Sequence, residues 1–122
     1  MSDARQRLGA AGEEAALQRY LEQGYGLVAR NWRCRLGELD LVLVRGSQLV
    51  ICEVKTRRGS RFGHGWEAVD ARKRAKLRAV AQAFLLAHPV RTASVRFDVA
   101  SVSVRDARDP SSAEVELFQD AF

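Results

Sequence analysis

Two short apolar runs separated by a turn constrain the fold of this chain more than any other feature. Residues 38–44 read ELDLVLV, residues 49–56 read LVICEVKT, and Arg45–Gln48 lie between them. Runs of this length that are rich in Val, Ile and Leu and are joined through a glycine-containing turn are typical of a β-hairpin. Charged side chains nonetheless stand inside these runs, where a sheet favours apolar residues. The hairpin therefore predicts both the centre of a sheet and a site on it.

The alternation of side chains along a strand collects these charges at one end of one face. A turn centred between the two runs predicts four facing pairs: Val44–Leu49, Val42–Ile51, Asp40–Glu53 and Glu38–Lys55. Opposed carboxylates repel each other, so that one takes a raised pKa or a cation lies between them. Magnesium, which commonly binds through one or two carboxylates, water and a substrate phosphate, suits the second arrangement. The alternative is an exposed sheet face on which Glu38 and Lys55 balance each other.

The remaining elements follow from periodicity and from breaks. The sequence predicts helices over residues 3–23 and 71–88 and strands over residues 25–34, 38–44, 49–56, 94–104 and 114–119. Asp70 is the expected N-cap of the second helix, which ends before Pro89. The expected architecture is α/β, in the order α-β-β-β-α-β-β, with a mixed central sheet flanked by helices. The length favours a single domain spanning residues 1–122.

The first predicted helix carries an acidic residue on its apolar side. Glu13 lies in the middle of a stripe with helical spacing that is formed by Ala10, Ala16, Leu17 and Tyr20. A carboxylate directed at a core is rarely buried without a partner, so Glu13 is a candidate for reaching the charges of the hairpin. The alternative is that this end of the helix is exposed and that Glu13 lies in solvent.

The formal net charge is +5, which favours an acidic partner, most commonly nucleic acid. Basic side chains gather around a polar loop at residues 57–69, and seven are predicted to contact a phosphate backbone: Arg57, Arg58, Arg61, Arg72, Lys73, Arg74 and Lys76. The alternative is a solvated surface whose aliphatic stems cover apolar groups. In the same loop, Phe62 and Trp66 either stack on unpaired bases or close the core, and His64 is a weaker catalytic candidate.

Cellular location is constrained by the cysteines and by the apolar runs. Cys34 and Cys52 have neither CxxC nor zinc-site spacing, which is typical of reduced thiols in the cytoplasm. The charged N-terminal stretch is unlike a signal peptide, and the longest apolar runs are too short to cross a bilayer. The sequence therefore predicts a cytoplasmic protein without a membrane partner.

Together these motifs resemble those of a known superfamily. An acid, then Asp40, then Glu53-x-Lys55 on a hairpin is similar to the restriction-endonuclease-like PD-(D/E)XK nucleases. A closer resemblance is to the YraN family of small bacterial proteins, which look distantly related to archaeal Holliday-junction resolvases. It covers nearly the whole chain through GEEAALQRYL from Gly12, RNWRCRLGELDLV from Arg30, EVKTRR from Glu53, FG at 62–63, Lys73, RFDV from Arg96 and the C-terminal DAF.

The resemblance implies a nuclease fold and the hydrolysis of phosphodiester bonds, with Mg²⁺ or Mn²⁺, in branched or otherwise structured DNA. It assigns the metal to Glu13, Asp40, Glu53 and the main-chain carbonyl of Val54. It assigns Lys55 to the attacking water.

Several points stay open at the level of sequence. Leu39-Asp40 stands where the superfamily has Pro-Asp, which leaves the metal-binding acid intact. Asp98 is expected to serve the structure, and Glu38 receives no role. One alternative is a non-catalytic nucleic-acid-binding or adaptor module that retains the fold, and another is a protein-interaction domain. The sequence does not distinguish DNA from RNA as the substrate. A homodimer also stays an open alternative, because no residue marks a dimer face.

Overall fold

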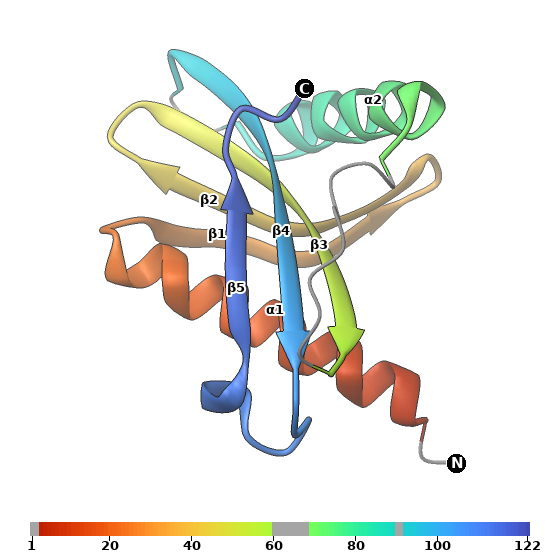
Figure 1. Ribbon diagram of the computed structural model, residues 1–122. Coiled ribbons are helices and arrows are strands. Elements are labelled where there is room, and N and C mark those ends of the chain that lie inside the picture. Colours follow the sequence, from red (N-terminus) through yellow and green to blue (C-terminus); the bar gives the residue numbers. More distant parts are fainter. Residues whose placement is uncertain (1–2, 60–68, 90–91) are drawn as a thin grey trace.

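The structure is a computed structural model that describes residues 3–59, 69–89 and 92–122 (Figure 1). Its helices are α1 (Ala4–Glu22), α2 (Ala71–Ala87) and the short 3-10 helix η2 (Pro110–Ser112). Its strands are β1 (Gly26–Cys34), β2 (Gly37–Arg45), β3 (Gln48–Arg58), β4 (Ser94–Val104) and β5 (Glu114–Phe118). The predicted α/β class and the order α-β-β-β-α-β-β are confirmed.

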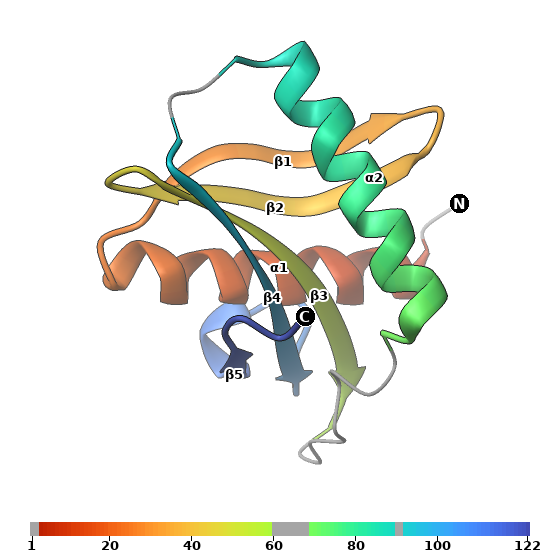
Figure 2. The ribbon, with the colours of Figure 1, turned by 90° about the horizontal axis from the view of Figure 1, so that it is seen from above.

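The five strands form one mixed sheet in the order β1-β2-β3-β4-β5. Neighbouring strands are antiparallel except β3 and β4, which are parallel. A parallel pair needs a crossover connection, and α2 supplies it on one face of the sheet, while α1 covers the other face (Figures 1 and 2). The predicted mixed sheet between helices is therefore confirmed.

The predicted helix boundaries have identifiable chemical causes. The side chain of Asp70 accepts a hydrogen bond from the backbone N–H of Lys73 (2.9 Å), so the predicted N-cap of α2 is confirmed. Asp3 caps α1 in the same way through the N–H of Arg5 (2.9 Å). Gly24 follows the end of α1 with a φ of +89°, a conformation that favours glycine and ends the helix.

Two apolar clusters fill the spaces between the sheet and the helices. On β3, Val50 and Cys52 face α1, whereas Leu49 and Ile51 face α2. The α2 side is closed by a stripe that agrees with the prediction, namely Leu77, Val80, Ala81 and Phe84, with Leu85 half-buried beside it. Each fully buried large side chain contributes roughly 1.5–3 kcal/mol of transfer free energy. Both faces of the sheet are therefore committed to core packing along most of its length.

The buried stripe of α1 differs from the predicted one. Ala11, Gly12 and Ala15 are buried with the expected apolar residues, whereas Ala10 is exposed. Glu13 consequently lies at the margin of the buried face and not in its middle. Small residues carry little hydrophobic signal, which is why the sequence pattern placed the stripe one position away.

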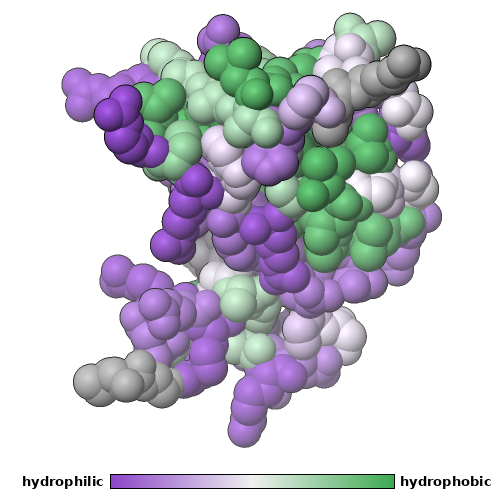
Figure 3. All heavy atoms as spheres, turned by 180° about the vertical axis from the view of Figure 1, so that it is seen from behind, coloured by the Kyte–Doolittle hydropathy of each residue, from purple (hydrophilic) through white to green (hydrophobic). Residues whose placement is uncertain are grey.

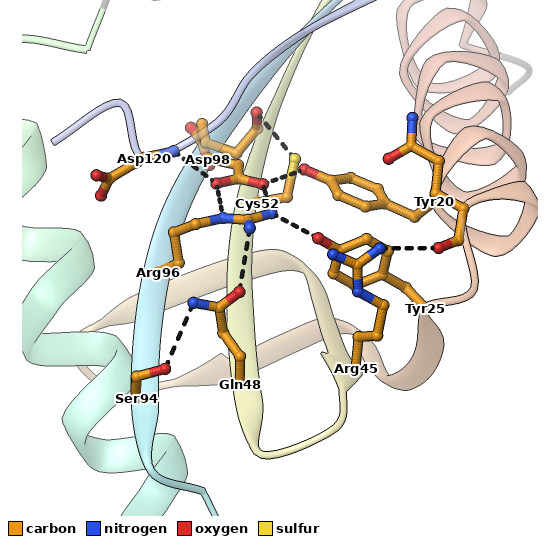
Figure 4. Close-up of polar contacts among 11 residues, drawn as sticks. Tyr20, Tyr25, Arg45, Gln48, Cys52, Ser94, Arg96, Asp98 and Asp120 are labelled. Atoms are coloured by element: carbon orange, nitrogen blue, oxygen red, sulfur yellow. Dashed lines mark hydrogen bonds and ion pairs between the residues drawn. The ribbon is translucent and has the colours of Figure 1, made fainter.

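Asp98 is the buried centre of a polar network (Figure 4). Its carboxylate accepts hydrogen bonds from the hydroxyl of Tyr20 (2.7 Å), from Nε and Nη2 of Arg96 (2.8 Å each) and from the N–H of Asp120 (2.9 Å). Arg96 also donates to the hydroxyl of Tyr25 (3.0 Å). The network joins α1, β4 and the C-terminal segment, so the expected structural role of Asp98 is confirmed.

Candidate active site

The strands β2 and β3 separate at the point where the predicted charges begin. The ladder between them pairs Val44 with Leu49 and Val42 with Ile51, as predicted, and it ends at the pair Leu41–Cys52. Beyond that pair the two strands diverge, and α2 crosses over the space between them (Figure 2). We call this place the acidic fork; it contains Asp40 of β2 and Glu53 of β3.

Asp40 bridges the two strands where the ladder stops. Its Oδ2 atom accepts a hydrogen bond from the backbone N–H of Val54 at 2.8 Å, in place of a main-chain carbonyl. Burial, and after it the charge of Glu53, raises the pKa of Asp40 to about 8. The predicted proximity of the two carboxyl groups is therefore present, although a side-chain hydrogen bond replaces the predicted continuation of the ladder.

Glu53 lies between two lysines. Its side chain is only 11% exposed, and its Oε2 atom lies 3.1 Å from Nζ of Lys73 and 3.6 Å from Nζ of Lys55. Burial, together with Lys73, lowers the pKa of Lys55. For Lys73, burial acts to lower the pKa, but the hydrogen bond with Lys55 and the charge of Glu53 outweigh it and raise the pKa. Lys55 is consequently the ammonium group that gives up its proton more readily.

A hollow of about 370 Å³ opens onto the fork. Its polar wall consists of three carboxylates and two lysines: Glu38, Asp40, Glu53, Lys73 and Lys76. Its apolar wall comes from α2 through Leu77 and Val80. The hollow therefore offers oxygen ligands and ammonium groups together beside an apolar surface, which suits a charged ligand that is partly withdrawn from water.

Glu13 approaches the fork from α1 on the neighbouring side. It helps to line a second hollow of about 270 Å³, which shares Glu38 with the first. Burial raises the pKa of Glu13, while a hydrogen bond with Asn31 and the charge of Arg30 oppose that rise. The charges of Glu38 and Glu53 also raise the pKa of Glu13, so Glu13 lies near enough to the fork to interact with it electrostatically. Figure 3 shows hydrophilic side chains on both sides of a notch in this view of the surface.

Glu38 does not form the predicted pair with Lys55. It lies opposite Arg33 in the β1–β2 ladder, and its Oε2 atom is 2.8 Å from Nε of that arginine. The strands have already separated at Glu38, so Lys55 turns to Glu53 instead. The charge balance between Glu38 and Lys55 that the sequence suggested is therefore wrong.

The predicted backbone-contact residues divide into three groups. Those that are exposed and available at the surface are Arg57, Arg58, Arg72 and Lys76. Lys73 contacts Glu53, and Arg74 is half-buried, with its Nε atom donating to the carbonyl of Val69 (2.8 Å). Arg61 lies outside the described residues, as do the other candidates of the loop, Phe62, His64 and Trp66.

Sequence reasoning missed one contact and one residue of this region. Lys73 was assigned to phosphate because of its place in a basic run; its helical line with Leu77 and Val80 directs it toward the sheet, but its contact with Glu53 was not predicted. Asn31 was not considered, although Asn is among the few residues that adopt a left-handed backbone, here with a φ of 53°. A polar residue with a tendency toward left-handed backbone inside a predicted strand was the available signal.

The carboxylates of the fork do not by themselves complete a metal site. In the parts of the chain that the structure describes, no group of three or more Asp, Glu, His or Cys side chains is arranged to hold a metal ion. Asp40 and Glu53 nonetheless fit the one or two carboxylates that Mg²⁺ commonly uses, and a cation would relieve the repulsion between them. The assignment of Glu13, Asp40, Glu53 and Val54 to a metal remains a prediction.

No helix within residues 3–59, 69–89 and 92–122 is long and apolar enough to cross a membrane. The cytoplasmic location remains a prediction.

A small α/β protein with a lysine-bordered acidic fork in a mixed sheet is the class that this fold and site define. Comparison with protein families places the chain further: residues 12–102 match the uncharacterised protein family UPF0102, and the chain belongs to it. It is 53% identical over 100 residues to a UPF0102 protein of Frankia alni, covering 82% of this chain and 83% of that protein.

Two further relatives cover the chain almost completely. A UPF0102 protein of Frankia casuarinae is 46% identical over 119 residues, which is 98% of each chain. A UPF0102 protein of Moorella thermoacetica is 40% identical over 122 residues, which is 100% of each chain.

Proposed function

We propose that this protein is a metal-dependent endonuclease that hydrolyses phosphodiester bonds in DNA, with branched or structured DNA as the expected substrate. The observation that carries the proposal is the meeting of Asp40 and Glu53 in one partly buried hollow, with Nζ of Lys55 3.6 Å from Glu53 and with Glu13 on the neighbouring side. The resemblance to the PD-(D/E)XK nucleases and to the YraN family supports the same reading.

The residues of the fork have distinct tasks in this proposal. Asp40, Glu53 and the carbonyl of Val54 hold Mg²⁺ or Mn²⁺, with Glu13 completing the set. The bound ion polarises the scissile phosphate and increases the acidity of water. Lys55 orients the attacking water, and its neutral amine form, which the lowered pKa makes more accessible, accepts the proton of that water. Arg57, Arg72 and Lys76, exposed near the site, hold the phosphate backbone.

The test is cleavage of junction, flap and linear DNA with Mg²⁺ or Mn²⁺. Wild type is expected to cut at least one substrate, and Asp40→Asn and Lys55→Met to lose roughly 100-fold or more of that activity. Glu114→Gln, which removes an exposed carboxylate of β5, is the matched control and retains activity. Equal cleavage by wild type and Asp40→Asn would reveal a contaminating nuclease.

One observation favours an alternative function. The ammonium group of Lys73 lies 3.1 Å from Glu53 and neutralises a carboxylate that the nuclease reading gives to a metal. A non-catalytic module that binds nucleic acid through the same basic surface would tolerate this contact permanently. That alternative predicts no cleavage of any substrate and DNA binding that neither metal ions nor Lys55→Met alters.

A further inference from the structure

A second concentration of charge lies at the other face of the sheet, where β3 and β4 end. Arg58 is the last residue of β3 and stands opposite Val104, the last residue of β4. Side chains alternate along β3, so Arg58 points to the α1 face, whereas Glu53 and Lys55 point to the α2 face. Arg105 follows the end of β4 directly. The two strand ends therefore deliver two arginines to the surface beside α1.

These arginines border a hollow of about 550 Å³ together with Arg7 of α1. We call it the arginine cavity, defined by Arg7, Arg58 and Arg105. Its wall also includes Ala4, the first residue of α1, whose N-terminus is capped by the carboxylate of Asp3.

The cavity has an excess of positive charge that the protein does not balance. Its one acidic lining residue, Asp106, accepts hydrogen bonds from the backbone N–H (3.0 Å) and Nε (3.3 Å) of Arg108. Among the described residues, no carboxylate lies within ion-pair distance of Arg7, Arg58 or Arg105. All three side chains are exposed, so they are free to bind an external anion.

We propose that the arginine cavity binds a phosphate group of a nucleic-acid backbone, as a contact site separate from the acidic fork. Guanidinium groups suit this ligand because each donates two parallel hydrogen bonds to phosphate oxygens. The identity of the partner rests on the proposed function. The cavity thereby extends the expected DNA contact from the α2 face around the end of β3 to the α1 face.

The spacing explains why a polymer is the partner. Glu53 and Arg58 are five positions apart on β3, which corresponds to roughly 16 Å at about 3.3 Å per residue. A DNA strand advances about 3.4 Å along the helix axis per phosphate, so the two sites are about five phosphates apart. A single nucleotide cannot reach both, whereas a duplex lying across the end of β3 can.

Binding of a fluorescein-labelled DNA duplex, measured by anisotropy in EDTA at a series of salt concentrations, tests the proposal without any cleavage. The cavity variant is Arg58→Gln/Arg105→Gln. The matched control is Arg19→Gln/Arg45→Gln. It removes one charge near the C-terminal end of α1 and one at the C-terminal end of β2, both away from the cavity. Thermal unfolding first establishes that both variants are folded.

The cavity variant is expected to bind the duplex about tenfold or more weakly than wild type. The slope of log affinity against log salt should decrease in magnitude by about 0.9, since the cavity binds one phosphate and each phosphate contact contributes about 0.9. The control should change the slope by less than half as much. Equal changes in the two variants would mean that only net charge matters and would overturn the proposal.

Two further outcomes separate this inference from the proposed function. If wild type cleaves DNA and the cavity variant binds the duplex with unchanged affinity and slope, phosphate binding by the cavity is overturned, whereas the proposed nuclease function is not. If wild type cuts no DNA but the cavity variant still shows the smaller salt-dependence slope, phosphate binding by the cavity is supported and the proposed nuclease function is overturned. Polyglutamate is the probe for an acidic protein partner, and an equal loss of polyglutamate and DNA binding in the cavity variant would overturn phosphate recognition.

Discussion

Asp40 is the residue at which stability and the proposed chemistry conflict. Burial and the charge of Glu53 raise its pKa from an ordinary 3.8 to about 8. A carboxyl group that holds its proton more tightly in the folded state than in the unfolded chain destabilises the fold when it ionises. Its contribution to stability is thus complete below about pH 4 and is lost as the pH rises through about 8.

Replacing Asp40 with Asn removes this loss. In EDTA at pH 8, Asp40→Asn is expected to raise the free energy of unfolding by about 2–5 kcal/mol, because one unit of pKa corresponds to about 1.4 kcal/mol. The amide oxygen can still accept the N–H of Val54. At pH 4 the two proteins should differ by less than about 0.5 kcal/mol. Urea denaturation across this pH range measures the effect, and Glu114→Gln should follow wild type throughout.

The two lysines beside Glu53 make a second prediction at the residue scale. Lys73→Gln removes a positive charge that, after burial, lowers the pKa of Lys55, so that pKa should rise. The chain contains three lysines, so the ¹³Cε resonances can be followed individually in a metal-free NMR titration. Lys76→Gln is the matched control from the same helix. An unchanged Lys55 pKa in Lys73→Gln would show that the ammonium groups do not interact.

At the scale of elements, the close packing of α1 on β3 depends on one glycine. A Cβ atom at Gly12 would overlap Oγ1 of Thr56 and approach Cγ2 and Cβ of Thr56 to 2.7 and 2.8 Å. Thr56 belongs to the strand that carries Glu53 and Lys55, so the position of this glycine also sets how near α1 brings Glu13 to the fork.

Gly12→Ala is therefore expected to destabilise the protein by about 1–3 kcal/mol, as overpacking of a core commonly does. Gly9→Ala is the matched control in the same helix: no atom lies within 4 Å of its added Cβ, and it should stabilise the protein by about 0.5–1 kcal/mol. Thermal unfolding of the two variants measures the difference. Similar stability in both would contradict a tight contact between α1 and β3.

The same elements show how far sequence reasoning reaches. The hairpin register and α2 stripe were predictable because each depends on a local period that branched apolar residues reveal. The separation of the two strands at the acidic fork was not predictable. β2 pairs with β3 only from Leu41 onward, and before that residue the side chain of Asp40 accepts the hydrogen bond from the N–H of Val54. Leu39 shows the consequence: alternation gives it the face of Leu41, yet it packs with the cluster under α2.

The acids of the site were predictable and their partners were not. Asp40 and Glu53 are visible as charges that interrupt apolar strands. Lys73 reaches Glu53 from another element through a long side chain. Helical spacing directs this side chain toward the sheet but does not identify its partner. Glu13 was identified as unusual for a reason that was partly wrong, since it stands at the edge of the buried face of α1.

At the scale of the whole molecule, two regions rich in charged side chains, the acidic fork and the arginine cavity, lie on opposite faces of one sheet. The buried network around Asp98 holds α1, β4 and the C-terminal segment together (Figure 4). A partner that touches both regions must pass around the ends of β3 and β4. The separation of the two regions is therefore set by the positions of Glu53 and Arg58 along β3.

The thermal stability of the whole molecule also measures whether a metal ion binds at the acidic fork. Mn²⁺ that binds only the folded state should stabilise wild type by about 2.7 kcal/mol at 100 times its Kd, which raises the Tm by several degrees. The shift should be larger at pH 8 than at pH 5, because the ion must displace the proton that Asp40 holds. Asp40→Asn and Glu53→Gln should lose most of it, while Glu114→Gln keeps it. An equal shift in Glu53→Gln and wild type would place the ion outside the acidic fork, where Lys55 has no water to activate.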